Sequence, residues 1–250
     1  MPDNYRIVTG RDHPDLRALS RTVVPPAWPE FMMHDPVAQG FVECYQQLGE
    51  FQFVLMENGT DDVLALGNSL PLQWDGAIDD LPDEGWDWAM EKGLDDLHAG
   101  RRPNLLCALQ IVVPSRHKGR HFSGEAVSAM KAIAKAHGLD GLIAPVRPNH
   151  KARYPLTPME SYVRWMLDDG WPFDPWMRVH ARLGARTVKV CHRAMLITGT
   201  VNEWESWTKM RFPDSGEYVV EGALRPVEID RGRDLGTYIE PNVWMHHPTE

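Results

Sequence analysis

With 250 residues, the chain is long enough to bury a full hydrophobic core, and its composition is that of a globular protein. The formal charge of −9 argues against general nucleic-acid binding, because a phosphate backbone requires clustered cations. No apolar run reaches the roughly 18 residues of a membrane span, and residues 1–11 are polar, so we expect a cytoplasmic protein with no membrane partner. Three widely spaced cysteines form no disulfide framework and no zinc site, and we expect no bound metal.

Two helices are predicted near the N-terminus. Residues 12–21 have a helical pattern, and a second helix is expected to begin with Asp35 as its cap and Pro36 as its first residue. Proline is favoured there because the first helical position needs no amide hydrogen.

A β-hairpin follows these helices. Residues 51–56 and 63–72 are strand-like, and Asn58-Gly59 lies between them. This dipeptide favours the positive φ angles of a tight turn, so the two strands are expected to be antiparallel neighbours.

The segment 73–100 is strongly acidic, with Lys92 as its single lysine or arginine. Such a segment is typical of a solvated face. It also fits a cleft that attracts a cationic amine, if its carboxylates point into that cleft. Both interpretations remain open at this stage.

The most informative segment is an apolar run, 105–113, that leads into a basic loop and then a helix. The run predicts a strand buried on both faces, which ends at Pro114 because proline has no amide hydrogen to donate. Ser123 is expected to cap the following helix, and Gly138 to end it. Free amides, the helix dipole and the cations of the loop together predict a site for a diphosphate.

The remaining elements are predicted in the following order. A buried strand spans 139–146, and an insertion at 147–173 contains a helix around 158–167. A helix from Asp174 to Gly184 begins with Asp174 as cap and Pro175 in the first turn, and a strand covers 186–192. Residues 218–229 and 238–244 are expected to be extra strands that extend the sheet or form a dimer contact.

The chain resembles the GNAT family of acyl-CoA-dependent N-acyltransferases, whose hallmark is a strand, a loop of the form Gln/Arg-x-x-Gly-x-Gly/Ala and a helix. Two registers of the loop fit, Arg116-x-x-Gly119-x-His121 and Lys118-x-x-His121-x-Ser123. A second stretch, from His180 to Ala185, resembles the family signature Tyr-x-Lys-x-Gly-Phe, with histidine in the tyrosine position.

The resemblance implies a mixed α/β fold, with a mostly antiparallel sheet flanked by helices and extra C-terminal strands. It implies a GNAT-like domain over 1–192 and an extension over 193–250 packed on the same domain. The implied activity is acyl transfer, from acetyl-CoA by default, to an amine of a small molecule by direct attack.

The resemblance also implies particular site residues. His180 is expected to protonate the leaving thiolate, with Tyr154 and Tyr162 as alternative donors, although His180 could instead be a packed core residue. The residues expected to hold the CoA pyrophosphate and polarise the thioester are Ile111, Val112, Val113, Lys118, Gly119, Arg120, His121, Phe122 and Ser123.

Two other functions compete with this one. The irregular motifs, with His121 and His180 in place of the usual residues, also fit a non-catalytic CoA sensor or interaction module on the same fold. A hydrolase would need a nucleophile elbow or a metal cluster, and the sequence shows neither.

Overall fold

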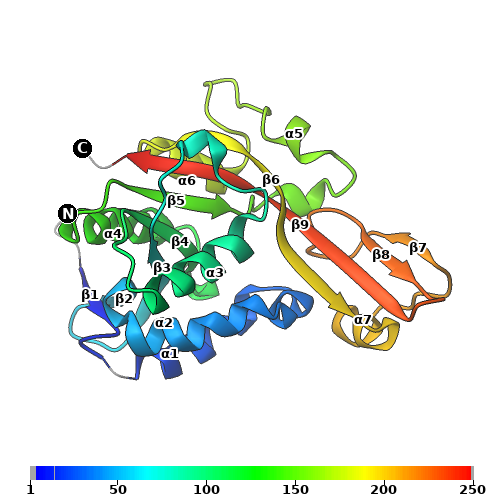
Figure 1. Cartoon of the computed structure of the whole chain (residues 1–250), viewed down its shortest axis with the longest axis horizontal. Coiled ribbons are helices and arrows are strands. Elements are labelled where there is room, and N and C mark those ends of the chain that lie inside the picture. The colour runs from blue at the N-terminus through cyan, green and yellow to red at the C-terminus, as the bar shows by residue number, and fades with distance from the viewer. Residues whose placement is uncertain (1–3, 14, 249–250) are drawn as a thin grey trace.

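The computed structural model of the chain describes residues 4–13 and 15–248, and its strands form one nine-stranded sheet. The strands are β1 (Tyr5–Thr9), β2 (Gln52–Glu57), β3 (Val63–Leu72), β4 (Leu105–Val112), β5 (Gly141–Val146), β6 (Arg186–Gly199), β7 (Gly216–Tyr218), β8 (Val227–Asp230) and β9 (Leu235–Pro248). The α-helices are α1 (Leu16–Val23), α2 (Phe41–Gln47), α3 (Gly85–His98), α4 (Phe122–Ala136), α5 (Met159–Tyr162), α6 (Pro175–Arg182) and α7 (Val201–Thr208). The predicted fold class is confirmed: the sheet is largely antiparallel and is flanked by helices (Figure 1).

The N-terminal part agrees with the sequence in its hairpin and differs in its first strand. β2 and β3 pair antiparallel, and Gly59 has a φ of 78° in the turn between them. β1, which pairs with β2 at the edge of the sheet, was not predicted, because its half-exposed residues lack a clear apolar alternation. Asp35 precedes a short 3-10 turn, Val37–Gly40, that leads into α2.

The parallel pair β4 and β5 is joined over a short length only. Leu105, Leu106 and Cys107 pair with residues 141–143, and beyond them the two strands separate. On its other edge β4 stays paired with β3, but the register shifts opposite Leu109. A bulge of this kind bends and twists a strand, and β4 therefore turns away from β5.

The C-terminal segment supplies the longest pairing in the sheet. β9 pairs antiparallel with β5 through its C-terminal half and with β6 along most of its length. Its N-terminal half pairs with β8, and β6, β7, β8, β9 and α7 form an arm that projects from the body (Figure 1). The predicted strand over 218–229 was wrong in extent, because only β7 and β8 at its two ends are extended.

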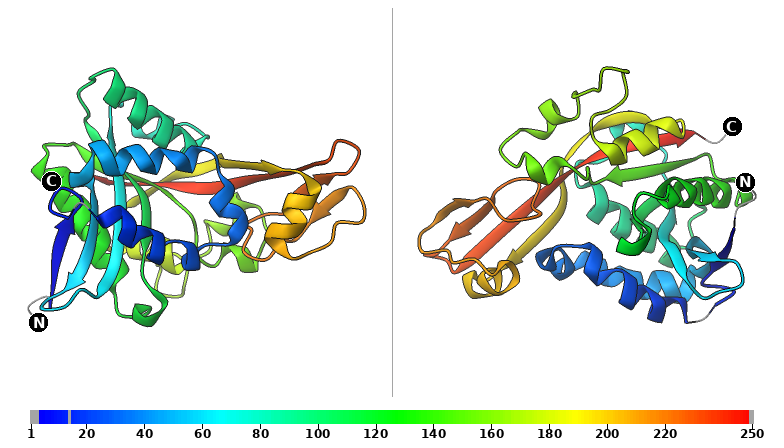
Figure 2. Two further views of the ribbon diagram at one scale, coloured as in Figure 1. Left: turned by 90° about the horizontal axis from the view of Figure 1, so that it is seen from below. Right: turned by 180° about the vertical axis from the view of Figure 1, so that it is seen from behind.

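The helices cover both faces of the sheet. α3, which lies in the acidic segment, packs on β3, β4, β6 and β9, whereas α4 packs on β3, β4 and β5 from the opposite face (Figures 1 and 2). Within the 147–173 insertion, helix α5 is shorter than the sequence predicted. None of the helices in the described residues is both long and apolar enough to span a bilayer.

We predict opposite effects for the same substitution in α3 and in α4. A Cβ added to Gly93 would lie 2.4 Å from Cδ2 of buried Leu70, so Gly93→Ala should destabilise the fold by about 1–3 kcal/mol. A Cβ at Gly124 meets its nearest neighbour at 3.9 Å, so Gly124→Ala should stabilise it by about 0.5–1 kcal/mol. Urea unfolding measures both, and a stabilised Gly93→Ala variant would contradict the tight contact between α3 and β3.

Candidate active site

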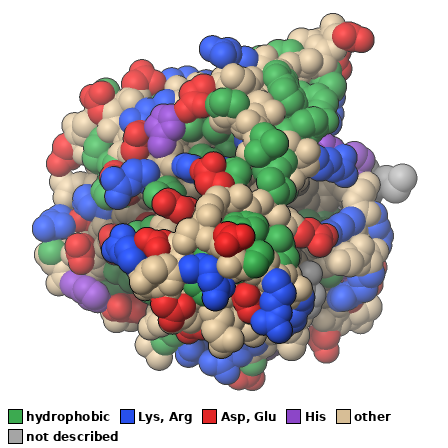
Figure 3. Space-filling view, turned by 90° about the vertical axis from the view of Figure 1, so that its right-hand side faces the viewer, with side chains coloured by type: hydrophobic (Ala, Val, Ile, Leu, Met, Phe, Trp, Pro, Cys, Tyr) green, Lys and Arg blue, Asp and Glu red, His purple; other side chains and the backbone are tan. Residues whose placement is uncertain are grey.

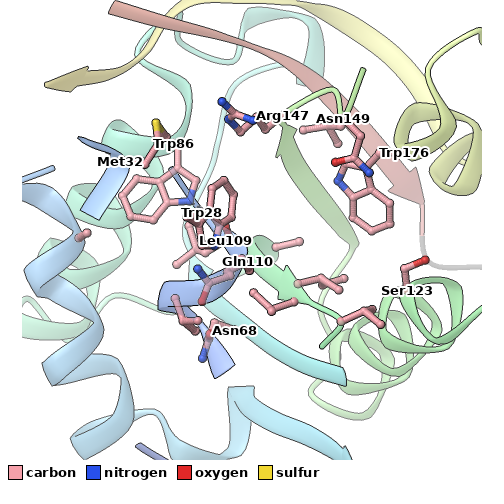
Figure 4. Close-up of a pocket in the computed structure, with 18 of the residues that line it drawn as sticks. Trp28, Met32, Asn68, Trp86, Leu109, Gln110, Ser123, Arg147, Asn149 and Trp176 are labelled. Carbon is pink, nitrogen blue, oxygen red and sulfur yellow. Dashed lines mark hydrogen bonds between the residues drawn. The ribbon is translucent and has the colours of Figure 1, made fainter. Parts of the chain in front are cut away.

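A cavity of about 1220 Å³ lies where β4 and β5 separate. Residues 108–113 line one side and residues 144–150 the other, while the segment 27–42, the basic loop and α6 complete the wall. Asn68, Trp86, Arg147 and Trp176 surround it (Figure 4). The separation of the two strands therefore creates an opening in the middle of the sheet.

The basic loop supplies unpaired amides at one end of this cavity. Gly119 has a φ of 81° and His121 a φ of 66°, so both residues are left-handed. Among the described residues, no protein acceptor receives the N–H groups of Gly119, His121, Phe122 or Ser123. The positive end of the α4 dipole lies at the same place, which suits an anion.

The loop geometry favours one of the two predicted registers. The left-handed angle at Gly119 fits a position where the motif requires glycine, as in Arg116-x-x-Gly119-x-His121. The prediction that Ser123 caps the helix was wrong, because α4 begins at Phe122 and His121 is the preceding residue. Ser123 lies in the first turn and lines the cavity.

An acidic residue of the β2–β3 hairpin holds the start of this loop. The Asp62 carboxylate accepts hydrogen bonds from Arg116 and lies 2.8 Å from Nε2 of the buried His117. Arg116 is the first cause of the lowered pKa of Asp62. Arg120 lies within 3.2 Å of the other His117 nitrogen. The side chains on the inner part of the loop are thus engaged with one another, and the amides stay open.

β4 brings its bulge to the cavity wall. Nε1 of Trp86 donates to the carbonyl of Leu109 at 2.8 Å, so α3 holds the bulged residue in place. Ile111, Val112 and Val113 line the cavity beyond it, on the strand edge that no longer pairs with β5. Backbone groups on this edge are available to a ligand.

His180 lies in α6 at the cavity wall, with a buried side chain. Asp174 caps this helix as predicted, accepting from the amides of Trp176 and Met177. Nδ1 of His180 lies 2.9 Å from Nε2 of His247, and Nε2 of His180 is buried without a hydrogen-bond partner among the described residues. Burial, and then the charge of His247, lower the pKa of His180 to about 3, so the ring is neutral at pH 7.

Tyr154 is not among the residues that line the cavity. Its ring packs at 4.9 Å from Trp165 and 6.0 Å from both Tyr162 and Phe173, in an aromatic cluster of the insertion. Tyr162 donates to Asp174 at 2.8 Å. These positions argue against the predicted roles of both tyrosines as proton donors.

A buried ion pair that the sequence did not reveal lies at the other end of the cavity. Nε of Arg147 is 3.0 and 2.9 Å from the two carboxylate oxygens of Glu240, which also accept from Tyr238 and Asn242. Arg147 Nη2 donates to the carbonyl of Gly222. The network joins the end of β5 to β9, and Arg147 and Glu240 are 93 positions apart, so no local motif could have indicated it.

A pair of adjacent carboxyl groups, of which Asp35 is buried and Asp87 is half-buried, lies near this network. Asp35 lines the cavity and Asp87 lies behind it in the first turn of α3. Burial raises the pKa of Asp35, while burial and the adjacent Asp35 raise that of Asp87 to about 8. Since two close carboxylates do not both ionise readily, the pair holds one proton at neutral pH.

The carboxyl groups of the acidic segment, 73–100, do not line the cavity. Asp79 pairs with Arg186, and Asp96 with Lys92 and Arg101. Of residues 73–100, Trp86 alone lines the cavity. No group of three or more potential metal ligands occurs within residues 4–13 and 15–248. Burial raises the pKa of the Cys107 thiol, in line with a packing role.

Comparison with known proteins gives one close relative and a set of similar folds. The chain is 30% identical to the arginine N-acetyltransferase avaD of Aspergillus versicolor, over 99% of this chain and 95% of that protein. The loading GNATL domain of CurA from Lyngbya majuscula superposes with a TM-score of 0.61 at 14% identity, with 98% of each chain covered. A GphF GNAT-like decarboxylase, solved with isobutyryl-CoA, gives 0.56 at 15% identity over 98% of this chain and all of the other. No protein-family model matches the chain.

We predict that removing one partner of the Arg147–Glu240 ion pair, and leaving the other buried, strongly destabilises the fold. Arg147→Met should destabilise the protein by about 3–5 kcal/mol, because it leaves a fully buried carboxylate without its cation. Adding Glu240→Gln should recover most of the loss, since the neutral amide still accepts from Tyr238. Urea unfolding at pH 7 tests this, and equal stability of the single and double variants would refute it.

Proposed function

Because the chain belongs to the GNAT family of acyl-CoA-dependent N-acyltransferases, we propose that it acetylates an amine of arginine, or of a small molecule with an arginine-like guanidinium group. The observation that carries this acceptor is the 30% identity to an arginine N-acetyltransferase across nearly the whole of both chains. The activity of that relative is the reason for naming arginine, and acetyl-CoA is proposed as the donor for the same reason.

In this proposal the CoA diphosphate binds the open amides of the basic loop. In the part of the chain that the structure describes, the N–H groups of Gly119, His121, Phe122 and Ser123 have no competing acceptor. Lys118 and Arg120 are exposed beside them and add positive charge. A diphosphate placed here is neutralised by amides and cations together, which supports high affinity for a dianionic group.

The thioester then lies in the opening between β4 and β5. An unpaired amide in the 111–113 region can donate to the thioester carbonyl and stabilise the oxyanion that forms when the amine attacks. The tetrahedral intermediate collapses with loss of the CoA thiolate, and the nitrogen gives up its proton. The apolar walls of the strands exclude water from the reacting carbon.

We assign His180 to the leaving sulfur. Its ring is neutral at pH 7, and in the tautomer with hydrogen on Nε2 this buried nitrogen, which has no partner among the described residues, can donate a hydrogen bond to a departing thiolate that comes within reach of it. A hydrogen bond of this kind stabilises the thiolate without a full proton transfer.

The assignment of His180 predicts a selective loss of turnover. His180→Phe should keep the KM for acetyl-CoA within about 2-fold and lower kcat about 10²-fold, as the loss of one donor to a developing anion does. His192→Phe, at an exposed histidine, is the matched control. Unchanged kcat in folded His180→Phe would remove His180 from the mechanism.

The activity itself is tested with a panel of acceptors. Purified protein is incubated with acetyl-CoA and arginine, agmatine, lysine, spermidine or glutamate, and thiol release and the acetylated product are measured. We expect product with arginine or agmatine above the other amines. Binding of acetyl-CoA in a calorimetric titration without any turnover would support the alternative, a non-catalytic CoA sensor. No acetyl-CoA binding at millimolar concentration would contradict the assignment of the loop.

Several sequence-based expectations stay predictions. They are the cytoplasmic location, the lack of nucleic-acid and membrane partners, the homodimer contact and the division into residues 1–192 and 193–250. On the face of the molecule in Figure 3, basic and acidic side chains are interspersed. That face therefore carries no extended cationic patch.

A further inference from the structure

One part of the cavity lies between α1 and α2. Its lining residues repeat at helical spacing, with Arg17, Ser20, Arg21 and Val24 from α1 and its C-terminal cap, and Ala38, Phe41, Val42 and Tyr45 from α2 and the turn before it. Tyr45 is hydrogen-bonded to Asn68 on β3. Figure 4 shows Asn68, Gln110 and Trp86 across the cavity from Ser123 and Trp176. A ligand between α1 and α2 therefore lies on the side away from the proposed diphosphate site.

Five polar side chains in this part of the cavity form a connected group, the Arg17 cluster, made of Arg17, Ser20, Tyr45, Asn68 and Gln110. Nδ2 of Asn68 donates to the Tyr45 hydroxyl at 2.7 Å, and Gln110 is the cross-strand partner of Asn68. Burial raises the pKa of Tyr45, and its hydrogen bonds with Ser20 and Asn68 oppose this effect. The positive charge of Arg17 acts on Tyr45 in the same direction as those bonds, so the guanidinium lies close to the hydroxyl.

The charge of Arg17 is available to a ligand. Arg17 is half-buried, and its guanidinium has no hydrogen bond or ion pair among the described residues. The other arginine deep in the cavity wall, Arg147, is held by Glu240. The side-chain amide of Gln110 is half-buried and likewise has no partner among the described residues. A half-buried guanidinium with open donors favours an anion at this place.

The cavity wall, within the described residues, presents no free carboxylate to a cation. Asp35 and Glu240 are the acids among the lining residues. Glu240 is paired with Arg147, and Asp35 shares a proton with the adjacent Asp87. An acceptor that carries an anionic group therefore suits this cavity better than one that carries positive charge alone.

We propose that Arg17 binds a carboxylate of the acceptor, which makes the enzyme selective for amino acids over the corresponding decarboxylated amines. This inference rests on the proposed function, because it places the acceptor in the same cavity. A planar guanidinium can donate two parallel hydrogen bonds to one carboxylate, and the amide of Gln110 is a further donor in the same cluster. With its carboxylate at α1, the acceptor extends past Gln110 on β4 toward the opening between β4 and β5, where the thioester is proposed to lie.

The test compares arginine with agmatine, which lacks only the carboxylate. In the unmodified protein, kcat/KM for arginine should exceed that for agmatine about 10- to 100-fold. Arg17→Gln should remove this preference by raising the KM for arginine, while kcat/KM for agmatine and the KM for acetyl-CoA stay within about 2-fold. Arg17→Lys keeps a cation without the planar geometry and should restore part of the preference. Arg11→Gln, at an exposed arginine that does not line the cavity, is the matched control and should leave the preference unchanged.

Arginine methyl ester tests the subsite on the unmodified protein, for the case in which a variant does not fold. The ester keeps the guanidinium but has no carboxylate charge, so it should be used as poorly as agmatine. Equal use of arginine and its ester overturns the subsite, as does a folded Arg17→Gln variant that still prefers arginine to agmatine. A rise in the KM for acetyl-CoA in place of that for arginine would assign Arg17 to the cofactor and also overturn it.

A second pair of amines separates failure of the subsite from failure of the proposed acceptor. If arginine, its ester and agmatine are all inactive, lysine is compared with cadaverine, its decarboxylated form. Preference for lysine would refute arginine as the acceptor and support the carboxylate subsite. Preference for cadaverine would overturn both.

Discussion

The separation of β4 from β5 is the constraint on which the rest of the site depends. Parallel strands normally stay paired, because each lost ladder bond leaves backbone groups without partners. Here the bulge at Leu109 turns β4 away, and Trp86 secures the bulged carbonyl with a hydrogen bond. On the other side, β9 holds β5 along its whole length. The surrounding elements thus leave the unpaired strand edges exposed to the cavity. Backbone groups on these edges can form hydrogen bonds with a ligand.

Besides the Arg17 cluster, the charged and polar groups around the cavity lie in three separate places. The basic loop presents amides and cations, and Asp35 lines another part of the cavity, with its carboxyl bonded to Asp87 behind it. The ion pair of Arg147 and Glu240 is close to neutral and lies at the end of β5. Arg147 therefore does not neutralise the Asp35–Asp87 pair, since its charge is paired with Glu240, and the pair holds a proton instead. Of these three places, the basic loop is the one whose open amides and cations favour an anion.

Sequence reasoning found the parts of the site that are continuous along the chain. The strand, basic loop and helix after residue 104 are local features, as is the Asp174 cap of α6, and each was predicted from adjacent residues. The carboxyl pair was missed because Asp35 and Asp87 meet only through the packing of α3 against the turn after Asp35. β1 was missed because an edge strand need not alternate in polarity when one side faces solvent. The separation of β4 and β5 could not be predicted from the sequence either, since it depends on which strands pair.

The role expected for His180 also had to be revised, because the surroundings of its ring depend on the fold. Its position in the motif indicated the side chain beside the sulfur, and an ordinary histidine pKa near 6.5 then suggests a proton donor. The fold buries the ring and sets it against His247, and these two effects together remove the protonated form at neutral pH. Proton transfer from a neutral imidazole to a thiolate is strongly uphill, because the ring N–H is a far weaker acid than a thiol. In the proposed mechanism, His180 therefore acts on the leaving sulfur as a hydrogen-bond donor only, and the proton reaches the thiolate from the attacking nitrogen or from solvent.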